Sequence, residues 1–448
     1  MTKHYHKSTS SPTGVPNGEA LLAAVATFLT TCRRPAVLEY GEEAQPLAQG
    51  QYALEIRGGK VWIEVWSETR SVSRRIVSIE RHSSGVLDCT IQRFGGKPGK
   101  LSFLDLDRPQ TGHKAVCGLR QAFAEQFRRM LFRQFPGWEI STLTCSMDLQ
   151  RSFSAIYPRA RLLRGSQQIA TVACPSPQDE PALLTSALIW YDYVRNHGQQ
   201  DTHTSLSLFL PDGAGNLTAH RLHWLTGGGL GYPSSAQSPG PRVFRFNAHG
   251  SAGEVDPQDL GNLDTRVSTT GSQTAGAEDR TAVSYSERCL ESVIRSNLGS
   301  VDSTLLAAPV HGQVLTFAAA DRDLIDLLAV SFSGRLTVLE LKVSEDIHLP
   351  IQALDYWMRI RWHAQRGELK QLFPGVPIES TPPKLLLVAP AMSFHSANST
   401  VLRYFSPEIE VERVGINSEW QQHLKVVMRL RGAAVPISHR DSPWALRV

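Results

Sequence analysis

A strand-like run near the C-terminal end, Val338-Leu-Glu-Leu-Lys342, holds two charged side chains inside an otherwise apolar segment. Because side chains alternate between the two faces of a strand, Glu340 and Lys342 lie on the same face. A charged side chain within a buried strand costs free energy unless it is paired or used by a ligand. The run therefore predicts a sheet with a charged site on one face. The alternative is an exposed edge strand with a solvated Glu340–Lys342 ion pair.

The segments around this run predict a mixed α/β domain. Asp326 lies inside a preceding strand, and Glu291 lies on a helix that Ser286 would cap at its N-terminus. A later helix starts after Pro350, where proline suits the first turn. The expected order is α-β-β-α-β-α-β: a helix at 286–298, strands at 324–330 and 336–342, the helix after Pro350, a strand at 385–389, a helix at 396–404 and a strand at 409–414.

The acidic residues of this region suit a divalent metal. Oxygen ligands from Asp326, Glu340 and Glu291 around one point would hold Mg²⁺ or Mn²⁺. Such a metal polarises a phosphoryl oxygen and lowers the pKa of bound water, and the Lys342 ammonium would orient that water and stabilise the developing charge. This is the chemistry of phosphodiester hydrolysis. Glu291 could instead form a solvated i,i+4 pair with Arg295, and Glu287 is interpreted as a solvated helix residue.

The same residues resemble a known family. Asp326 followed by Glu340-Leu-Lys342 resembles the D…(D/E)xK signature of the PD-(D/E)XK nuclease superfamily, which has a restriction-endonuclease-like core. Gln352-Ala-Leu-Asp-Tyr356 resembles the QxxxY motif of its RecB-like branch. Residues 286–430, roughly a third of the chain, are most similar to the C-terminal nuclease domain of NucS/EndoMS-type endonucleases. The matching segments are Glu287–Ile294, Asp323–Val330 and Leu385–Pro390.

The resemblance implies a metal site, a catalytic lysine and two supporting residues. In this sequence the metal ligands would be Asp326, Glu340 and Glu291, the catalytic lysine Lys342, and the supporting residues Gln352 and Tyr356, the last two by bracing the site or touching the DNA backbone. Two departures stand out. Leu324-Ile325 replaces the glycine-basic pair that commonly precedes the metal-site aspartate, and the N-terminal part is much longer than in NucS proteins. These departures bear on mismatch recognition more than on nuclease chemistry.

The rest of the chain predicts further units. We expect a basic, β-rich N-terminal unit with flanking helices at 1–136 and a small α/β unit at 137–226. A flexible Gly/Ser/Pro-rich linker at 227–285, with one candidate strand at Arg242–Phe246, leads to the nuclease-like domain at 286–432 and a tail at 433–448. The middle unit is loosely similar in order to the nuclease core but lacks an ExK. It is either a degenerate, inactive copy or an ordinary small α/β unit.

Charge and composition limit the kinds of partner that this protein is expected to bind. Between Glu55 and Arg133 the positive side chains exceed the negative ones by seven, which fits either a solvated basic surface or a nucleic-acid face. No apolar run of about 18 residues is present, so no membrane association is expected. The N-terminal segment lacks the apolar core of a secretory signal, and six scattered cysteines form no CxxC pair. We therefore expect a cytoplasmic protein with reduced cysteines.

The sequence thus predicts a metal-dependent DNA endonuclease acting in DNA repair or in defence against foreign DNA. Its substrate would be single-stranded, mismatched or branched DNA, and a homodimer would supply two centres for paired nicking of a duplex. The main alternative is a non-catalytic nucleic-acid-binding or scaffold protein that keeps a nuclease fold. A toxic effector of a bacterial defence system is a third interpretation.

Overall fold

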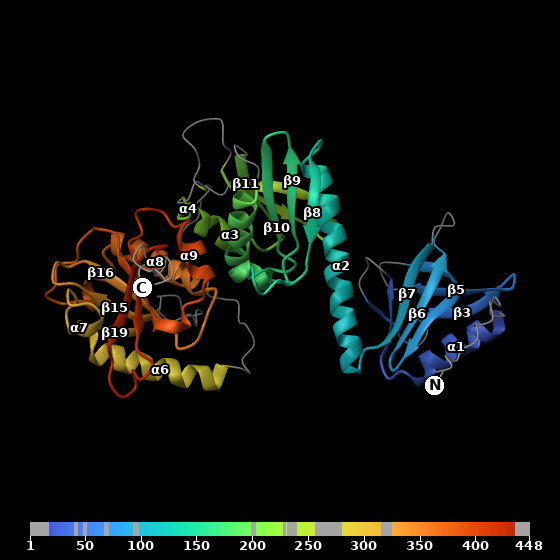
Figure 1. Ribbon diagram of the computed structural model, residues 1–448, viewed down its shortest axis with the longest axis horizontal. Helices are drawn as coiled ribbons and strands as arrows, with labels where there is room; N and C mark the ends of the chain where they lie inside the picture. Colours follow the sequence, from blue (N-terminus) through green and yellow to red (C-terminus); the bar gives the residue numbers. More distant parts are fainter. Residues whose placement is uncertain are drawn as a thin grey trace, which may run out of the picture. The chain divides into compact units, whose positions relative to one another are not determined.

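The computed structural model describes residues 18–39, 44–47, 52–66, 71–92, 98–198, 203–226, 230, 240–255, 280–314 and 325–434. The chain divides into two compact units, residues 1–129 and 130–448. The fold is mixed α/β, with one seven-stranded and two six-stranded sheets (Figure 1). Within the described residues, no helix is long and apolar enough to cross a membrane.

The first unit is a seven-stranded antiparallel sheet in the order β2-β1-β7-β6-β5-β4-β3. Helix α1 (Gly18–Thr31) buries Leu21, Val25 and Phe28 in the same apolar cluster as the alternate residues Val61 and Ile63 of β4. The strands are β1 (Pro35–Glu39), β2 (Gln45–Pro46), β3 (Tyr52–Arg57), β4 (Lys60–Trp66), β5 (Ser71–Ser83), β6 (Val86–Gln92) and β7 (Pro98–Asp105).

The second unit begins near the end of helix α2 (Pro109–Gln134) and opens with a six-stranded sheet, here called the middle sheet. Its order is β13-β12-β11-β10-β9-β8, with β10, β11 and β12 parallel and the outer strands antiparallel. The elements are β8 (Glu139–Thr144), β9 (Arg159–Arg164), β10 (Gln167–Ala173), α3 (Glu180–Asn196), β11 (His203–Pro211), α4 (Asn216–His223), β12 (Arg242–Phe246) and β13 (Ala252–Val255).

Within the expected linker at 227–285, the candidate strand at Arg242–Phe246 is confirmed, whereas the further strand beside it was not expected. Residues 242–246 form β12, which pairs in parallel with β11, and residues 252–255 add β13 beside it. The apolar residues Val243, Phe244 and Phe246 explain this, because all three are buried in the sheet. Residues 227–229, 231–239 and 256–279 of the expected linker lie outside the described residues.

The remaining part of the second unit forms another six-stranded sheet, here called the C-terminal sheet, in the order β14-β15-β16-β17-β18-β19. The expected strands and helices of this region are present, with β14 and β19 added at the edges. The elements are α6 (Arg280–Ser296), α7 (Leu298–Val301), β14 (His311–Val314), β15 (Ile325–Val330), β16 (Leu336–Leu341), α8 (Leu349–Gln365), β17 (Lys384–Pro390), α9 (Ala397–Leu402), β18 (Val411–Ile416) and β19 (Val426–Arg431). The expected N-cap at Ser286 is wrong, because the helix begins earlier, at Arg280. No glycine or proline interrupts residues 280–285.

The middle and C-terminal sheets share their connectivity. In each, three strands run antiparallel, a helix leads to a parallel fourth strand, a shorter helix leads to a parallel fifth, and the sixth returns antiparallel. The helices in these positions are α3 and α4 in one and α8 and α9 in the other. One buried apolar cluster contains side chains from α3, α8, α9 and both sheets, so the two halves of the second unit pack through these helices (Figure 1).

Candidate active site

The candidate site lies at the β15–β16 pair. All of β16 is buried, and the Glu340 residue is only 2 % exposed. The antiparallel register pairs Leu327 with Leu339, and its continuation places Asp326 opposite Glu340. Residues that face each other across two strands share one face of the sheet. The structure therefore brings Asp326 and Glu340 together, on the face expected from alternation.

Both carboxyl groups are held in an environment that disfavours negative charge. Burial raises the pKa of Asp326 to about 6, although its Oδ2 accepts a 2.8 Å hydrogen bond from the Leu341 backbone N–H. Burial and the neighbouring Asp326 raise the pKa of Glu340 well above its ordinary value. Glu340 Oε2 is buried without a hydrogen-bond partner. Two buried carboxyl groups this close require compensating positive charge to ionise together.

Lys342 supplies part of that charge. Its Nζ lies 3.2 Å from Glu340 Oε1 and 3.9 Å from Glu287 Oε1. Burial lowers the pKa of Lys342, but the carboxylates of Glu340 and Glu287 outweigh burial and hold this pKa above its ordinary value. The ammonium group therefore stays protonated at neutral pH and points into the acidic cluster.

Helix α6 contributes two glutamates with different partners. Glu291 Oε1 lies 2.8 Å from Arg295 Nη2, the i,i+4 pair weighed as the alternative, but its side chain is only 14 % exposed and so is not a solvated residue. Its charge also raises the pKa of Asp326. Glu287, interpreted from sequence as solvated, is the residue that reaches Lys342. The available signal was the i,i+4 spacing, which places Glu287 on the same helix face as Glu291.

The two supporting residues expected from the resemblance lie on α8. This helix packs against β16. Gln352 lies in its first turn, and its side-chain Oε1 is buried without a hydrogen-bond partner. Tyr356 is partly buried against the large apolar cluster. The Gln352 side chain therefore offers a polar group to a ligand, whereas the Tyr356 side chain packs against the apolar cluster.

The donor set fits a divalent cation in its chemistry. In the described residues no group of three or more His, Cys, Asp or Glu side chains is already arranged as a ligand shell. The unpartnered Oε2 of Glu340 nevertheless faces the side of the sheet that also carries Asp326. A cation placed between these carboxylates would satisfy that oxygen and favour the charged forms of both groups.

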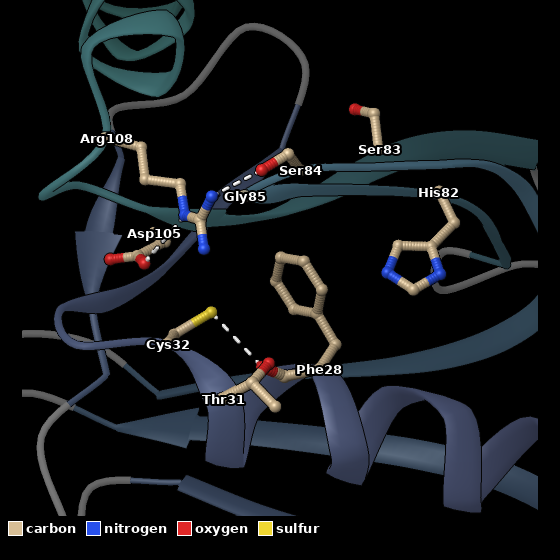
Figure 2. A pocket seen from close by; sticks show the side chains of 9 residues that line it. All are labelled: Phe28, Thr31, Cys32, His82, Ser83, Ser84, Gly85, Asp105 and Arg108. Carbon is tan, nitrogen blue, oxygen red and sulfur yellow. Dashed lines mark hydrogen bonds and ion pairs between the residues drawn. The ribbon is translucent and has the colours of Figure 1, made fainter.

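A cavity of about 380 Å³ lies in the first unit, between α1, the turn that joins β5 to β6, and the end of β7 (Figure 2). Arg108 lies 3.5 Å from Asp105 and also donates to Ser84. The Cys32 Sγ donates to the Phe28 carbonyl at 3.2 Å, and burial raises the pKa of this thiol to about 11. A thiol held protonated is a poor nucleophile, so this pocket offers weaker chemistry than the acidic cluster.

Two cations of the basic first unit are held in ion pairs. Arg74 Nε lies 2.9 Å from Glu39 Oε2, and Lys100 Nζ lies 3.0 Å from Glu80 Oε2. Paired cations attract a polyanion less than free ones do. The surplus therefore leaves both interpretations of this surface open.

Comparison of the chain with models of known protein families, with curated proteins and with solved structures finds no match.

Proposed function

We propose that this protein is a metal-dependent endonuclease that hydrolyses phosphodiester bonds in DNA, with a role in repair or in defence against foreign DNA. One observation carries the proposal. Asp326, Glu340 and Lys342 share one face of the β15–β16 pair, and a buried carboxylate oxygen of Glu340 has no partner. Buried groups of this kind are costly to the fold, which favours a functional reason for keeping them.

Each side chain has a role in this proposal. Asp326 and Glu340 hold a Mg²⁺ or Mn²⁺ ion, and Glu287 with Glu291 adds negative charge from α6. When bound there, the cation supplies Lewis-acid polarisation of a phosphate oxygen and a water of lowered pKa. The protonated Lys342 orients the attacking water and stabilises the negative charge that develops on the phosphate. Gln352 provides a polar contact to the substrate or to the site.

The proposal includes a restriction-endonuclease-like fold for residues 286–432. Its support is the match between the expected sequence motifs and the described elements. Asp326 lies on β15, Glu340 on β16, Lys342 directly after β16, and Gln352 with Tyr356 on α8. In this sheet, α8 precedes β17 along the chain and α9 follows it, and the strands β16, β17 and β18 pair in parallel.

A cleavage assay on labelled single-stranded, duplex, mismatched and branched DNA, with RNA of the same sequences, tests the proposal. We expect cleavage of DNA with Mg²⁺ or Mn²⁺ and none with EDTA. Glu340→Ala and Lys342→Ala should abolish it, whereas Lys370→Ala, at an exposed lysine on the surface, should cleave as the wild type does. Equal cleavage by wild type, Glu340→Ala and Lys342→Ala would refute the site.

The alternative of a non-catalytic nucleic-acid-binding protein has one observation in its favour, the lack of a preformed ligand shell in the described residues. It predicts DNA binding that is equal with Mg²⁺ and with EDTA, and no cleavage of any substrate. The same assay, run alongside a binding measurement, therefore separates the two functions.

A further inference from the structure

The two sheets of the second unit can be aligned residue by residue through their hydrogen bonds. In the C-terminal sheet, the residue after the last β16–β17 pair is Lys342, and its N–H donates to the Val388 carbonyl at 3.0 Å. In the middle sheet, the residue after the last β10–β11 pair is Cys174, and its N–H donates to the Phe209 carbonyl at 2.8 Å. Cys174 therefore holds the backbone position of Lys342.

The helices that follow these two strands support the same alignment independently. Helix α3 begins Glu180-Pro181 and α8 begins Leu349-Pro350, so each has proline as its second residue, at a similar distance after the strand. The side chains of Val172 and Cys174 also belong to the same buried cluster as Val338 of β16. The two strands thus present equivalent faces to equivalent helices.

At the aligned positions of β15, β16 and α8, every residue of the candidate site is replaced in the middle half. Because β9 and β10 pair Arg159 with Val172, as the register places Asp326 opposite Glu340, the whole set can be compared. In the middle sheet, Arg159 stands for Asp326, Val172 for Glu340, Cys174 for Lys342, Leu183 for Gln352 and Ala187 for Tyr356.

The substituted residues cannot hold a divalent cation. Arg159 is 5 % exposed, and its guanidinium donates to the carbonyls of Ser154 at 3.0 Å and Ser146 at 2.7 Å. It also lies 4.4 Å from the centroid of the Phe153 ring. A buried positive charge thus occupies the place of the Asp326 carboxylate, and burial keeps the Cys174 thiol protonated by raising its pKa.

The two halves also contact each other reciprocally. On one side, Arg221 of α4 forms a two-point ion pair with Asp355 of α8, at 2.7 and 2.5 Å. On the other, Arg403 at the end of α9 pairs with Asp192 of α3 at 2.7 Å. The shorter helix of each half therefore supplies an arginine to the longer helix of the other half.

Aromatic contacts repeat the same pattern. Trp224, just after α4, packs edge-on against Trp357 of α8 with ring centroids 4.9 Å apart. Tyr404, just after α9, packs edge-on against Tyr191 of α3 at 5.5 Å. This reciprocity is what two copies related by an approximate two-fold axis produce.

We infer that residues 130–255 and 280–434 are two copies of one architecture paired within a single chain, of which only the second is reactive, and that the chain therefore nicks one strand of duplex DNA per binding event. The inference rests on the proposed function. Two cuts on opposite strands need two reactive centres or a second binding event. The face of α8 and α9 is already covered by α3 and α4, so a second chain cannot pair through it.

Cleavage of supercoiled plasmid by the full-length protein with Mn²⁺ tests this inference. We expect nicked circles to account for more than about 80 % of the product before linear DNA appears, and Glu340→Ala to form neither. Linear DNA that appears without a nicked intermediate would overturn the inference and leave the proposed function standing. Cleavage of single-stranded DNA alone would do the same. No metal-dependent cleavage of any substrate would refute the proposed function itself.

A mixing experiment shows whether one chain acts alone. At fixed wild-type concentration and excess plasmid, a ten-fold addition of Glu340→Ala protein should leave the nicking rate unchanged within about two-fold. If two chains must pair to cut, inactive chains would capture most active ones and the rate would fall by about ten-fold. That fall would overturn the inference.

Discussion

The middle and C-terminal sheets have the same connectivity but carry different side chains at equivalent positions. Both bury their central strands, and both place one longer and one shorter helix on the shared side. The C-terminal sheet has Asp326 at the start of its second strand and Glu340 with Lys342 at the end of its third, whereas the middle sheet has Arg159, Val172 and Cys174 at these positions. Strand order thus depends on apolar patterning that both halves share, and reactivity depends on a few positions that they do not.

The two sheets also differ in the partners that surround a buried charged side chain. The Arg159 guanidinium donates to two carbonyl oxygens and lies 4.4 Å from the centroid of the Phe153 ring, while its buried Nε has no hydrogen-bond partner. Glu340 keeps an oxygen without a partner. Both side chains thus keep one unpartnered atom, but only the carboxyl oxygen of Glu340 can serve as a ligand to a divalent cation. The comparison therefore agrees with the proposed division of roles, in which only the C-terminal sheet holds a cation.

The largest expected effect contrasts equivalent positions of the two sheets. Lys342→Ala should lower the cleavage rate about 100-fold or more, the usual loss when a group that stabilises transition-state charge is removed. Cys174→Ala, at the matching backbone position of the middle sheet, should leave the rate unchanged. Single-turnover cleavage of the preferred DNA measures both. A comparable loss in the two variants would contradict the division of roles.

The next effect concerns the contact between the halves. Arg221→Ala should lower the free energy of unfolding by about 3 kcal/mol, because it leaves the Asp355 carboxylate without its buried partner; the Arg221 side chain is 2 % exposed. Arg403→Ala removes the reciprocal pair, whose arginine is 48 % exposed, and should cost less than about 1 kcal/mol. Urea unfolding compares them, and equal losses would show that burial does not distinguish the two pairs.

A smaller effect is expected from metal. At a Mn²⁺ concentration ten times the dissociation constant, binding to the folded state should stabilise the wild type by about 1.4 kcal/mol. Glu340→Gln should lose this stabilisation, whereas Gln168→Glu, a change in the middle sheet, should keep it. Thermal unfolding with and without Mn²⁺ measures the shift. A shift that persists in Glu340→Gln would place the metal elsewhere.

The smallest effect is on acid stability. Lys384, whose counterpart in the middle sheet is Ser205, lies 2.8 Å from both Asp302 Oδ2 and Glu412 Oε2. Burial raises the pKa of each carboxyl, but hydrogen bonds outweigh it and leave both pKa values below their ordinary level; they come from Lys384 to both groups, from Thr304 to Asp302 and from Arg429 to Glu412. Groups with a lowered folded-state pKa stabilise the fold above their unfolded pKa, about 4, and lose that contribution as the pH falls through the folded value.

Stability should therefore decline from about pH 5 downward, and Lys384→Met should make that decline shallower. Denaturation curves between pH 3 and pH 7 measure it, with Lys370→Met as the exposed control. An unchanged pH profile in Lys384→Met would show that this cluster does not contribute.

Much of the C-terminal sheet could be predicted from sequence because its strands are short apolar runs with clear breaks. The same logic placed Glu340 and Lys342 on one face, since alternation is a local property of a strand, whereas the position of Asp326 opposite Glu340 follows from the register between two strands. It misjudged Glu287, because whether a helix carboxylate is solvated depends on which strand end lies beside it. It identified the strand at 242–246 but placed it within a linker and missed the strand at 252–255, since the flanking Gly, Ser and Pro residues outweighed short apolar runs.

The sequence by itself determined the local elements, the faces of the strands and the charged positions on them, because these follow from periodicities of a few residues. Only the tertiary structure decided that β12 completes the middle sheet and that the two sheets share one connectivity. It alone set the register that matches Arg159 to Asp326, and it paired the two halves through α3, α4, α8 and α9. Those facts depend on contacts between residues far apart in the chain, which no local pattern records.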